Sequence, residues 1–282
     1  MGELELTNKS RLAWSEYGAT DGEPVLYFHG APGSRLEAQP ADKIAKALKL
    51  RLISIDRPGY GDSTLQDDFN LLDWPGVISQ LADKLNLERF SILGFSCGGI
   101  YALACAHEMP EKINHLTLVS CPAPFETQAM QEYISVDFKP FYELSVADKI
   151  AAAQQFSQLA PSAEALFNIL HAPLPACDKA IFSQNSMHTH YLENLTEAIK
   201  NGSDGLVNDL RNMALPWQFN PGDIPLTVNI WHGENDLNFG VGIGKYLADT
   251  LENSSPQFLD NNGHYLLFEH WREILECFRT SS

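Results

Sequence analysis

The sequence predicts an α/β protein in which a mostly parallel central sheet is flanked by helices and interrupted by a helical insertion. Three observations support this fold class. Short apolar runs typical of buried strands alternate with helical patterns as far as residue 121, the strand signal then disappears until about residue 223, and it returns afterwards. We therefore expect a core domain formed by 1–121 and 224–282, with a helical cap domain over 122–223.

Residue patterns in the first half of the core predict its strands and helices. Polar and apolar residues alternate in 3–7 and 10–18, which predicts an antiparallel hairpin at the sheet edge. Buried strands are expected at 25–30, 51–56, 90–96 and 115–121. Helices are expected at 41–48 and 73–87, the second with Asp73 as its N-cap.

Helix signals dominate the insertion. Ser145 and Asp148 have the spacing of a capping box, and Leu206, Leu210 and Met213 fall on one helical face. The insertion is rich in aromatic residues, most of which we expect to pack inside it, while the remainder are candidates for lining a pocket. The core then resumes with strands at 226–233 and 256–260 and helices at 241–251 and 265–278.

Composition excludes several classes of function. The 282 residues include 36 acidic and 19 basic side chains, so the net charge of -17 disfavours nucleic acid and membrane surfaces as partners. Five scattered cysteines without a C-x-x-C pair favour free thiols over a disulfide framework or a zinc site. The acidic N-terminus is unlike a signal peptide and no apolar stretch is long enough to span a membrane, so we expect a cytoplasmic protein.

The strongest chemical signal is the run GFSCGG at 94–99, which follows an apolar strand and opens a helical run ending before Pro110. It matches G-x-S-x-G in the context of a sharp strand-to-helix turn. Small residues two positions before and after Ser96 let strand and helix approach closely, and the hydroxyl is pushed clear of the sheet. Ser96 is therefore the candidate nucleophile.

A serine hydroxyl needs a base to remove its proton and an acid to orient that base. Of nine histidines, His264 follows the last expected strand at the carboxyl edge of the sheet, where Ser96 should also lie. Asp236 follows the preceding strand and gives the chain order Ser, Asp, His. Glu234, on the same turn, is the alternative acid.

The oxyanion that develops during acyl transfer needs preorganised N–H donors. The amide of Cys97 directly follows the candidate nucleophile at a helix N-terminus. A second amide is expected from the loop HGAPG at 29–33, at Ala31.

With these motifs in place, the whole chain resembles the α/β-hydrolase family. The matching segments, in the family's order, are HGAPG (29–33), DRPGYGDS (56–63), GFSCGG (94–99), HGEND (232–236) and NNGH (261–264). The resemblance implies the α/β-hydrolase fold with an inserted helical cap. It implies that Ser96, Asp236 and His264 form the catalytic triad, that Ala31 and Cys97 form the oxyanion hole, and that neither a metal nor an organic cofactor is needed.

The resemblance also implies supporting roles for four residues of these motifs. Arg57 and Asp62 are expected to be structural, and His29 and His232 are expected to be framework residues at strand ends.

Within the family, two motifs point in different directions. HGAPG is similar to the HGGPG of proline iminopeptidases, whereas GFSCGG is closer to the elbow of cofactor-free haloperoxidases and related esterases. We expect a serine hydrolase acting on a small or medium uncharged ester, with a small-molecule substrate as its partner. The alternatives are a proline iminopeptidase-like aminopeptidase and a non-catalytic ligand-binding receptor.

Four of the acidic residues of the insertion leave two interpretations open. They either bind a substrate amine or face water; they are Glu193, Glu197, Asp204 and Asp209. The sequence does not indicate an oligomeric state.

Overall fold

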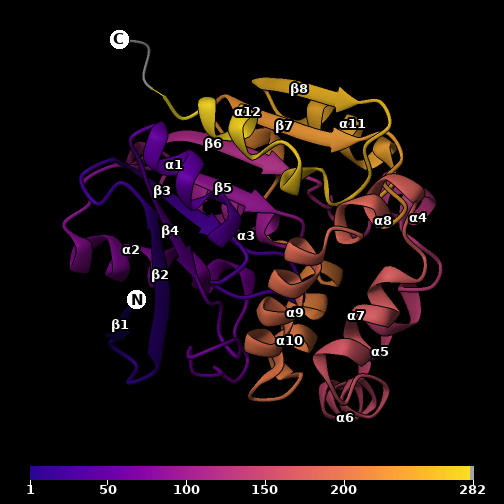
Figure 1. Cartoon of the computed structure of the whole chain (residues 1–282). Coiled ribbons are helices and arrows are strands. Elements are labelled where there is room, and N and C mark those ends of the chain that lie inside the picture. The colour runs from indigo at the N-terminus through magenta and orange to yellow at the C-terminus, as the bar shows by residue number, and fades with distance from the viewer. Residues whose placement is uncertain (280–282) are drawn as a thin grey trace.

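The protein is described by a computed structural model that covers residues 1–279. Its eight strands form one sheet in the order β1-β2-β4-β3-β5-β6-β7-β8 (Figure 1). The strands are β1 (Gly2–Glu5), β2 (Arg11–Gly18), β3 (Glu23–Phe28), β4 (Leu50–Ile55), β5 (Phe90–Phe95), β6 (Ile113–Val119), β7 (Val228–Gly233) and β8 (Ser254–Leu259). Strand β2 pairs antiparallel with β1 and β4, and the remaining pairs are parallel, so the expected edge hairpin and mostly parallel sheet are confirmed.

Helices cover both faces of this sheet. They are α1 (Asp42–Ala47), α2 (Trp74–Leu85), α3 (Gly98–Glu108), α11 (Val241–Thr250) and α12 (Trp271–Glu276). Along β3, Leu26 and Phe28 belong to the core beneath α2, α3 and α11, whereas Val25 and Tyr27 belong to the core beneath α1 and α12. Because successive side chains of a strand point to opposite faces, a central strand that is apolar throughout is buried on both sides.

The chain between β6 and β7 leaves the sheet. We call residues 122–223 the cap segment; Figure 1 shows its helices gathered on one side of the sheet. They are α4 (Gln128–Tyr133), α5 (Lys139–Ala147), α6 (Lys149–Leu159), α7 (Ala163–His171), α8 (Ala176–Phe182), α9 (Asn185–Ile199) and α10 (Asp204–Ala214). Short 3-10 helices occur at Gln39–Ala41, Leu71–Asp73, Pro110–Lys112, Pro221–Asp223 and Leu266–Phe268.

Of the two capping predictions, the capping box is wrong, and Asp73 is the N-cap of α2 without a capping bond from its side chain. Asp148, and not Ser145, caps a helix: its Oδ1 accepts from the amides of Ile150 and Ala151, at the start of α6. Ser145 lies inside α5, where its hydroxyl donates to a backbone carbonyl one turn earlier, an alternative open to any serine within a helix. Asp73 stands at the start of α2, but its carboxylate accepts from the amide of Asn70 in the preceding turn.

The expected final helix over 265–278 is also interrupted. Its first part is the 3-10 helix Leu266–Phe268, and α12 begins only at Trp271. Among residues 1–279, no helix has both the length and the apolar character that crossing a membrane requires.

Candidate active site

Ser96 occupies a strained turn between β5 and α3. Its φ is +51°, in the left-handed region that side chains rarely adopt. The turn requires glycine on both sides: a Cβ at Gly98 would collide with the carbonyl oxygen of Phe28, and a Cβ at Gly94 would lie 2.7 Å from the Cα of Gly99. The turn therefore places the hydroxyl at the carboxyl edge of the sheet.

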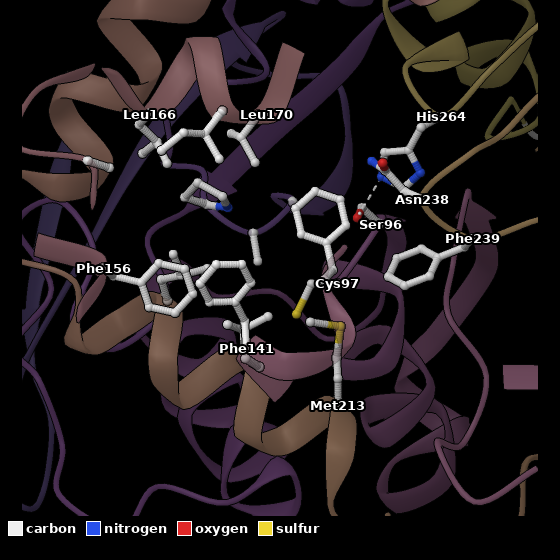
Figure 2. A pocket seen from close by; sticks show the side chains of 18 of the residues that line it. Ser96, Cys97, Phe141, Phe156, Leu166, Leu170, Met213, Asn238, Phe239 and His264 are labelled. Carbon is white, nitrogen blue, oxygen red and sulfur yellow. Dashed lines mark hydrogen bonds between the residues drawn. The ribbon is translucent and has the colours of Figure 1, made fainter. Parts of the chain in front are cut away.

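The structure brings the three residues proposed from the sequence together. His264 Nε2 lies 2.9 Å from Ser96 Oγ, and His264 Nδ1 lies 2.8 Å from Asp236 Oδ2. Figure 2 shows the contact between Ser96 and His264 as a dashed line. Each of the three residues is at most 5 % exposed, so these polar contacts are shielded from water.

Asp236 rather than Glu234 faces the imidazole. The Oδ1 of Asp236 accepts from the amides of Asn238 and Phe239 at 2.8 and 2.9 Å, which leaves Oδ2 for the imidazole. The Glu234 residue, two positions earlier, is exposed to solvent. The turn after β7 therefore fixes the choice between the two carboxylates.

The electrostatics favour a charged carboxylate beside a basic imidazole. Burial opposes ionisation of Asp236, but the nearby His264 and His232 outweigh it and hold the pKa of the carboxyl well below its ordinary value. Burial likewise lowers the pKa of His264, and the charge and hydrogen bond of Asp236 outweigh burial, so the net pKa is raised. The carboxylate of Asp236 therefore stabilises the protonated form of the His264 imidazole.

Ala31 and Cys97, whose amides are expected to form an oxyanion hole, both line the pocket at Ser96. Within residues 1–279, neither the amide of Ala31 nor that of Cys97 donates a hydrogen bond to another protein group. Gly30, the residue before Ala31, is held by two hydrogen bonds. Arg57 donates to its carbonyl at 2.8 Å, and Glu37 accepts from its amide at 2.8 Å. The loop is therefore anchored while the amide of Ala31 stays free for a ligand.

The pocket beside Ser96 is apolar on its cap side. Figure 2 shows Phe141, Phe156, Leu166, Leu170 and Met213 together across the pocket from His264. Its volume is about 90 Å³, below the usual size of sites for drug-sized ligands. Five aromatic residues of the insertion line the pocket: Phe138, Phe141, Tyr142, Phe156 and Tyr191.

The four acidic residues singled out from the sequence, Glu193, Glu197, Asp204 and Asp209, do not line this pocket. Glu193 and Asp204 are exposed to water, one of the two expectations for these residues. The other two fit neither expectation, because each is engaged by an arginine of the core: Asp209 Oδ2 lies 2.6 Å from Arg57 Nη2, and Glu197 Oε1 lies 2.5 Å from Arg35 Nη1. Sequence patterns could not show these pairs because the partners lie 152 and 162 positions apart.

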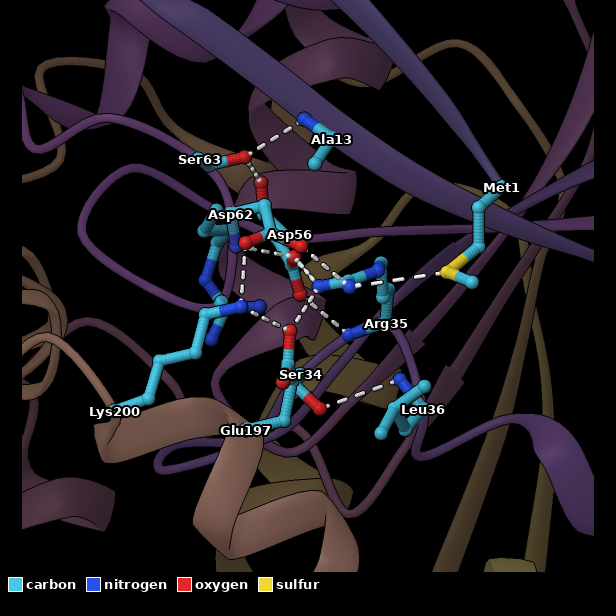
Figure 3. Close-up of polar contacts among 12 residues, drawn as sticks. Met1, Ala13, Ser34, Arg35, Leu36, Asp56, Asp62, Ser63, Glu197 and Lys200 are labelled. Carbon is cyan, nitrogen blue, oxygen red and sulfur yellow. Dashed lines mark hydrogen bonds and ion pairs between the residues drawn. The ribbon is translucent and has the colours of Figure 1, made fainter.

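Glu197 belongs to a wider charge cluster that joins the cap segment to the core (Figure 3). Arg35 also pairs with Asp56 at 2.5 Å and with Asp62 at 2.7 Å. Lys200, on the cap side, contacts Asp62 at 2.5 Å and Glu197 at 2.7 Å. The structural role expected for Asp62 is thus a contact between the two parts of the chain.

The framework histidines bond to nearby backbone. The amide of Arg57 donates to His29 Nε2 at 3.2 Å, and His232 Nε2 lies 2.6 Å from the carbonyl oxygen of Phe239. Both imidazoles are buried. Within residues 1–279, no group of three or more His, Cys, Asp or Glu side chains is arranged to hold a metal ion.

Three residues near the site were missed by sequence reasoning. Glu37 is buried beneath the loop of Ala31, Ser120 donates to the carbonyl of His264 at 2.8 Å, and Asp178 accepts from the amide of His264 at 2.9 Å. Only Ser120 carries a usable signal, because it directly follows β6 at the carboxyl edge. The other two reach the site only through tertiary packing.

Comparisons with known proteins agree with this architecture. Solved structures that resemble the chain include a hydrolase from Pseudomonas aeruginosa PA01 (TM-score 0.75, 17% identity, 98% of this chain and 96% of the other). A bromoperoxidase from Bacillus anthracis is also similar in structure (TM-score 0.72, 18% identity, 95% of each chain). The esterase EaEST from Exiguobacterium antarcticum is a third (TM-score 0.69, 18%, 98% and 97%). At these identities the likeness concerns the fold alone.

Curated relatives are similar over shorter regions. A proline iminopeptidase of Lactobacillus delbrueckii subsp. bulgaricus is 28% identical over 163 residues, which is 55% of each chain. One from Neisseria gonorrhoeae is 27% identical over 136 residues, 46% of this chain and 44% of the other, so the chain spans about half the length of these relatives. Residues 23–270 match the family model described as "alpha/beta hydrolase fold". The chain therefore belongs to the alpha/beta hydrolase fold family.

Proposed function

We propose that the protein is a serine hydrolase that cleaves small or medium uncharged esters through an acyl-enzyme on Ser96. The observation that carries this proposal is the continuous chain of contacts from Ser96 Oγ to His264 Nε2 and from His264 Nδ1 to Asp236 Oδ2, at 2.9 and 2.8 Å. Nucleophile, base and orienting acid lie in the geometry that acyl transfer requires.

In the first half-reaction, His264 Nε2 accepts the proton of Ser96 as Oγ attacks the ester carbonyl carbon. The negative charge then develops on the carbonyl oxygen, where the amides of Ala31 and Cys97 stabilise it; each such donor contributes about 3–4 kcal/mol in comparable sites. As the bond to the leaving oxygen breaks, the imidazolium donates its proton to that oxygen. The alcohol departs and an acyl-serine remains.

In the second half-reaction, water takes the place of the alcohol. His264 accepts a proton from the water, whose oxygen attacks the acyl carbon, and the same two amides hold the second oxyanion. The imidazolium returns its proton to Ser96 Oγ as the acid leaves. Asp236 stays ionised throughout and stabilises the imidazolium.

The lining of the pocket favours an uncharged ester over an aminoacyl substrate. Glu37 is its only Asp or Glu within the described residues, and one carboxyl oxygen of Glu37 already accepts from the hydroxyl of Tyr27 and the amide of Gly30. An ammonium group has three donors and needs several acceptors. The apolar side chains of the cap segment offer none, so we propose that this segment selects an apolar acyl group.

A second candidate is an aminopeptidase, favoured by the similarity to proline iminopeptidases over about half of the chain. The two candidates differ in a direct comparison of kcat/KM for p-nitrophenyl acetate, butyrate and octanoate with that for prolyl p-nitroanilide. Faster turnover of the anilide would replace the esterase proposal with the peptidase one.

Ser96→Ala is the control for every substrate, and retained turnover in this variant would reject the site itself. Labelling of folded wild-type protein by a fluorophosphonate probe, located at Ser96 by mass spectrometry, tests the nucleophile separately. A folded protein that neither labels nor turns over any of these substrates would favour a ligand-binding role on the same fold.

A further inference from the structure

A buried carboxylate of the cap segment contacts the loop of His264. Asp178, in α8, is fully buried; its Oδ2 accepts from the amide of His264 at 2.9 Å and its Oδ1 accepts from the amide of Tyr265 at 3.1 Å. Each carboxylate oxygen thus serves one amide of the loop between β8 and α12. Two adjacent amides converging on one acceptor group fix the direction of the backbone at that point.

Gly263, the residue before His264, leaves room for this contact. A Cβ at Gly263 would collide with the carboxylate of Asp178, so glycine is needed for the helix to come so close. On the opposite side, the hydroxyl of Ser120 donates to the carbonyl of His264 at 2.8 Å. The backbone of His264 is therefore held at its amide by the cap segment and at its carbonyl by the core.

The geometry of His264 depends on these two contacts. Asp236 orients the ring through Nδ1, but the distance from Nε2 to Ser96 also depends on where the backbone stands. Without the carboxylate of Asp178, two buried amides would lose their acceptor, at a cost large enough to move the loop. A displacement of about 1 Å at a reacting group lowers turnover about 100-fold.

We propose that Asp178 is a positioning residue for His264. Through its carboxylate, α8 holds the loop of His264 in the position from which the imidazole reaches Ser96. This inference rests on the proposed function. It gives the cap segment a second role beside shaping the pocket, because the same segment that selects the acyl group also completes the support of the base.

The charge of Asp178 also acts on the imidazole. Three carboxyls face His264: Asp236 from the turn after β7, Asp178 from α8 and Glu37 from the loop after β3, while His232 contacts Asp236 from the other side. Asp236 raises the pKa of His264 most, and Asp178 and Glu37 add to the rise. Neutralising Asp178 therefore lowers the pKa of His264.

The test compares Asp178→Asn and Asp178→Ala with the matched control Glu193→Gln, which neutralises an exposed carboxyl of the cap segment. We expect Asp178→Ala to lower kcat on p-nitrophenyl butyrate about 10- to 100-fold with little change in KM. Asp178→Asn retains one acceptor oxygen and the side-chain volume, so its loss of kcat is smaller, and its acid limb in kcat/KM moves to lower pH because the pKa of His264 falls. Glu193→Gln behaves as wild type.

An activity-independent readout separates this inference from the proposed function. The pKa of His264 is measured by NMR titration of ¹³C-labelled histidine, with the resonance assigned through His264→Asn. A lower pKa in Asp178→Asn supports the inference even if no ester is cleaved. An unchanged His264 pKa, or an Asp178→Asn variant with wild-type kcat and acid limb, overturns it even if fluorophosphonate labels Ser96 as expected.

Discussion

Arg57 and Asp209, 152 positions apart in the sequence, form an ion pair in which both side chains are at most 2 % exposed. Arg57 comes from the loop after β4 and Asp209 from α10, so the pair crosses from core to cap segment. The hydroxyls of Tyr60 and Tyr101 also donate to Asp209, at 2.9 and 2.7 Å. The carboxylate therefore compensates a buried cation that at the same time holds the loop of Ala31 through the carbonyl of Gly30.

Replacement of Asp209 by Asn is expected to destabilise the protein strongly. The change leaves the Arg57 charge buried without a counter-ion, which costs about 3–5 kcal/mol. Urea unfolding followed by tryptophan fluorescence measures the loss. The matched double variant Arg57→Met with Asp209→Leu removes both charges and should recover part of it; a single variant as stable as wild type would show that the pair contributes little.

The pH profile of hydrolysis should report His264. The imidazole must be neutral to accept a proton from Ser96, and its pKa lies above the ordinary value of 6.5 because Asp236 outweighs burial. We expect kcat/KM for p-nitrophenyl butyrate to rise with pH through a limb centred above 6.5 and then to level off. Asp236→Asn should lower kcat about 10⁴-fold, since the imidazole loses its orienting acceptor. A pH-independent rate between 5 and 8 would contradict this assignment.

Glu37 should make stability depend on pH. Burial raises the pKa of Glu37 from 4.5 to about 7, against the hydrogen bonds from Tyr27 and Gly30. Because the folded-state pKa is the higher one, the contribution of this carboxyl is fully present below pH 4.5 and is lost as pH rises through about 7. Glu37→Gln should remove this loss, which amounts to about 3 kcal/mol.

The comparison for Glu37 is made by urea unfolding of both proteins at pH 4.5 and pH 8. The stability of wild type and variant should nearly coincide at the lower pH, where Glu37 is protonated, and diverge at the higher one. Parallel curves at a constant separation would mean that Glu37 ionises as it does in water.

Enlarging the pocket should change the preferred acyl chain. The rings of Phe141 and Phe156 stack at a centroid separation of 4.8 Å on the cap side of the pocket. Truncating Phe156 to Ala removes one wall, so we expect the ratio of kcat/KM for the octanoate over the acetate ester to rise about 10-fold, through roughly 1–3 kcal/mol of added chain burial. A matched truncation outside the pocket, Phe258→Ala on β8, should leave the ratio unchanged.

The sequence allowed the core and the proposed triad to be predicted because their signals are local. Ser96 lies within one strand-turn-helix unit, and Asp236 and His264 each directly follow a strand, so parallel topology alone puts them at one edge. Asp178 had no such signal. It approaches His264 from 86 positions away, at a place determined only by how the helices of the cap segment pack.

The same distinction explains the errors. Asp209 and Glu197 were expected either to bind a substrate amine or to face water, because nothing near them in the sequence reveals an arginine partner. Ser145 and Asp148 have the spacing of a capping box, yet Ser145 lies inside α5, where its hydroxyl donates to a backbone carbonyl one turn earlier. Local patterns therefore identify the elements correctly but not which of several competing polar contacts a side chain makes.

The late position of β7 and β8 has a consequence for how the protein becomes active during synthesis. Strands β1 to β6 and the turn of Ser96 leave the ribosome before β7, and the whole cap segment must follow before β7 can pair with β6. The acid and the base of the proposed reaction arrive only with these final strands. A nascent chain that ends before these strands thus carries the Ser96 hydroxyl without the imidazole proposed to activate it.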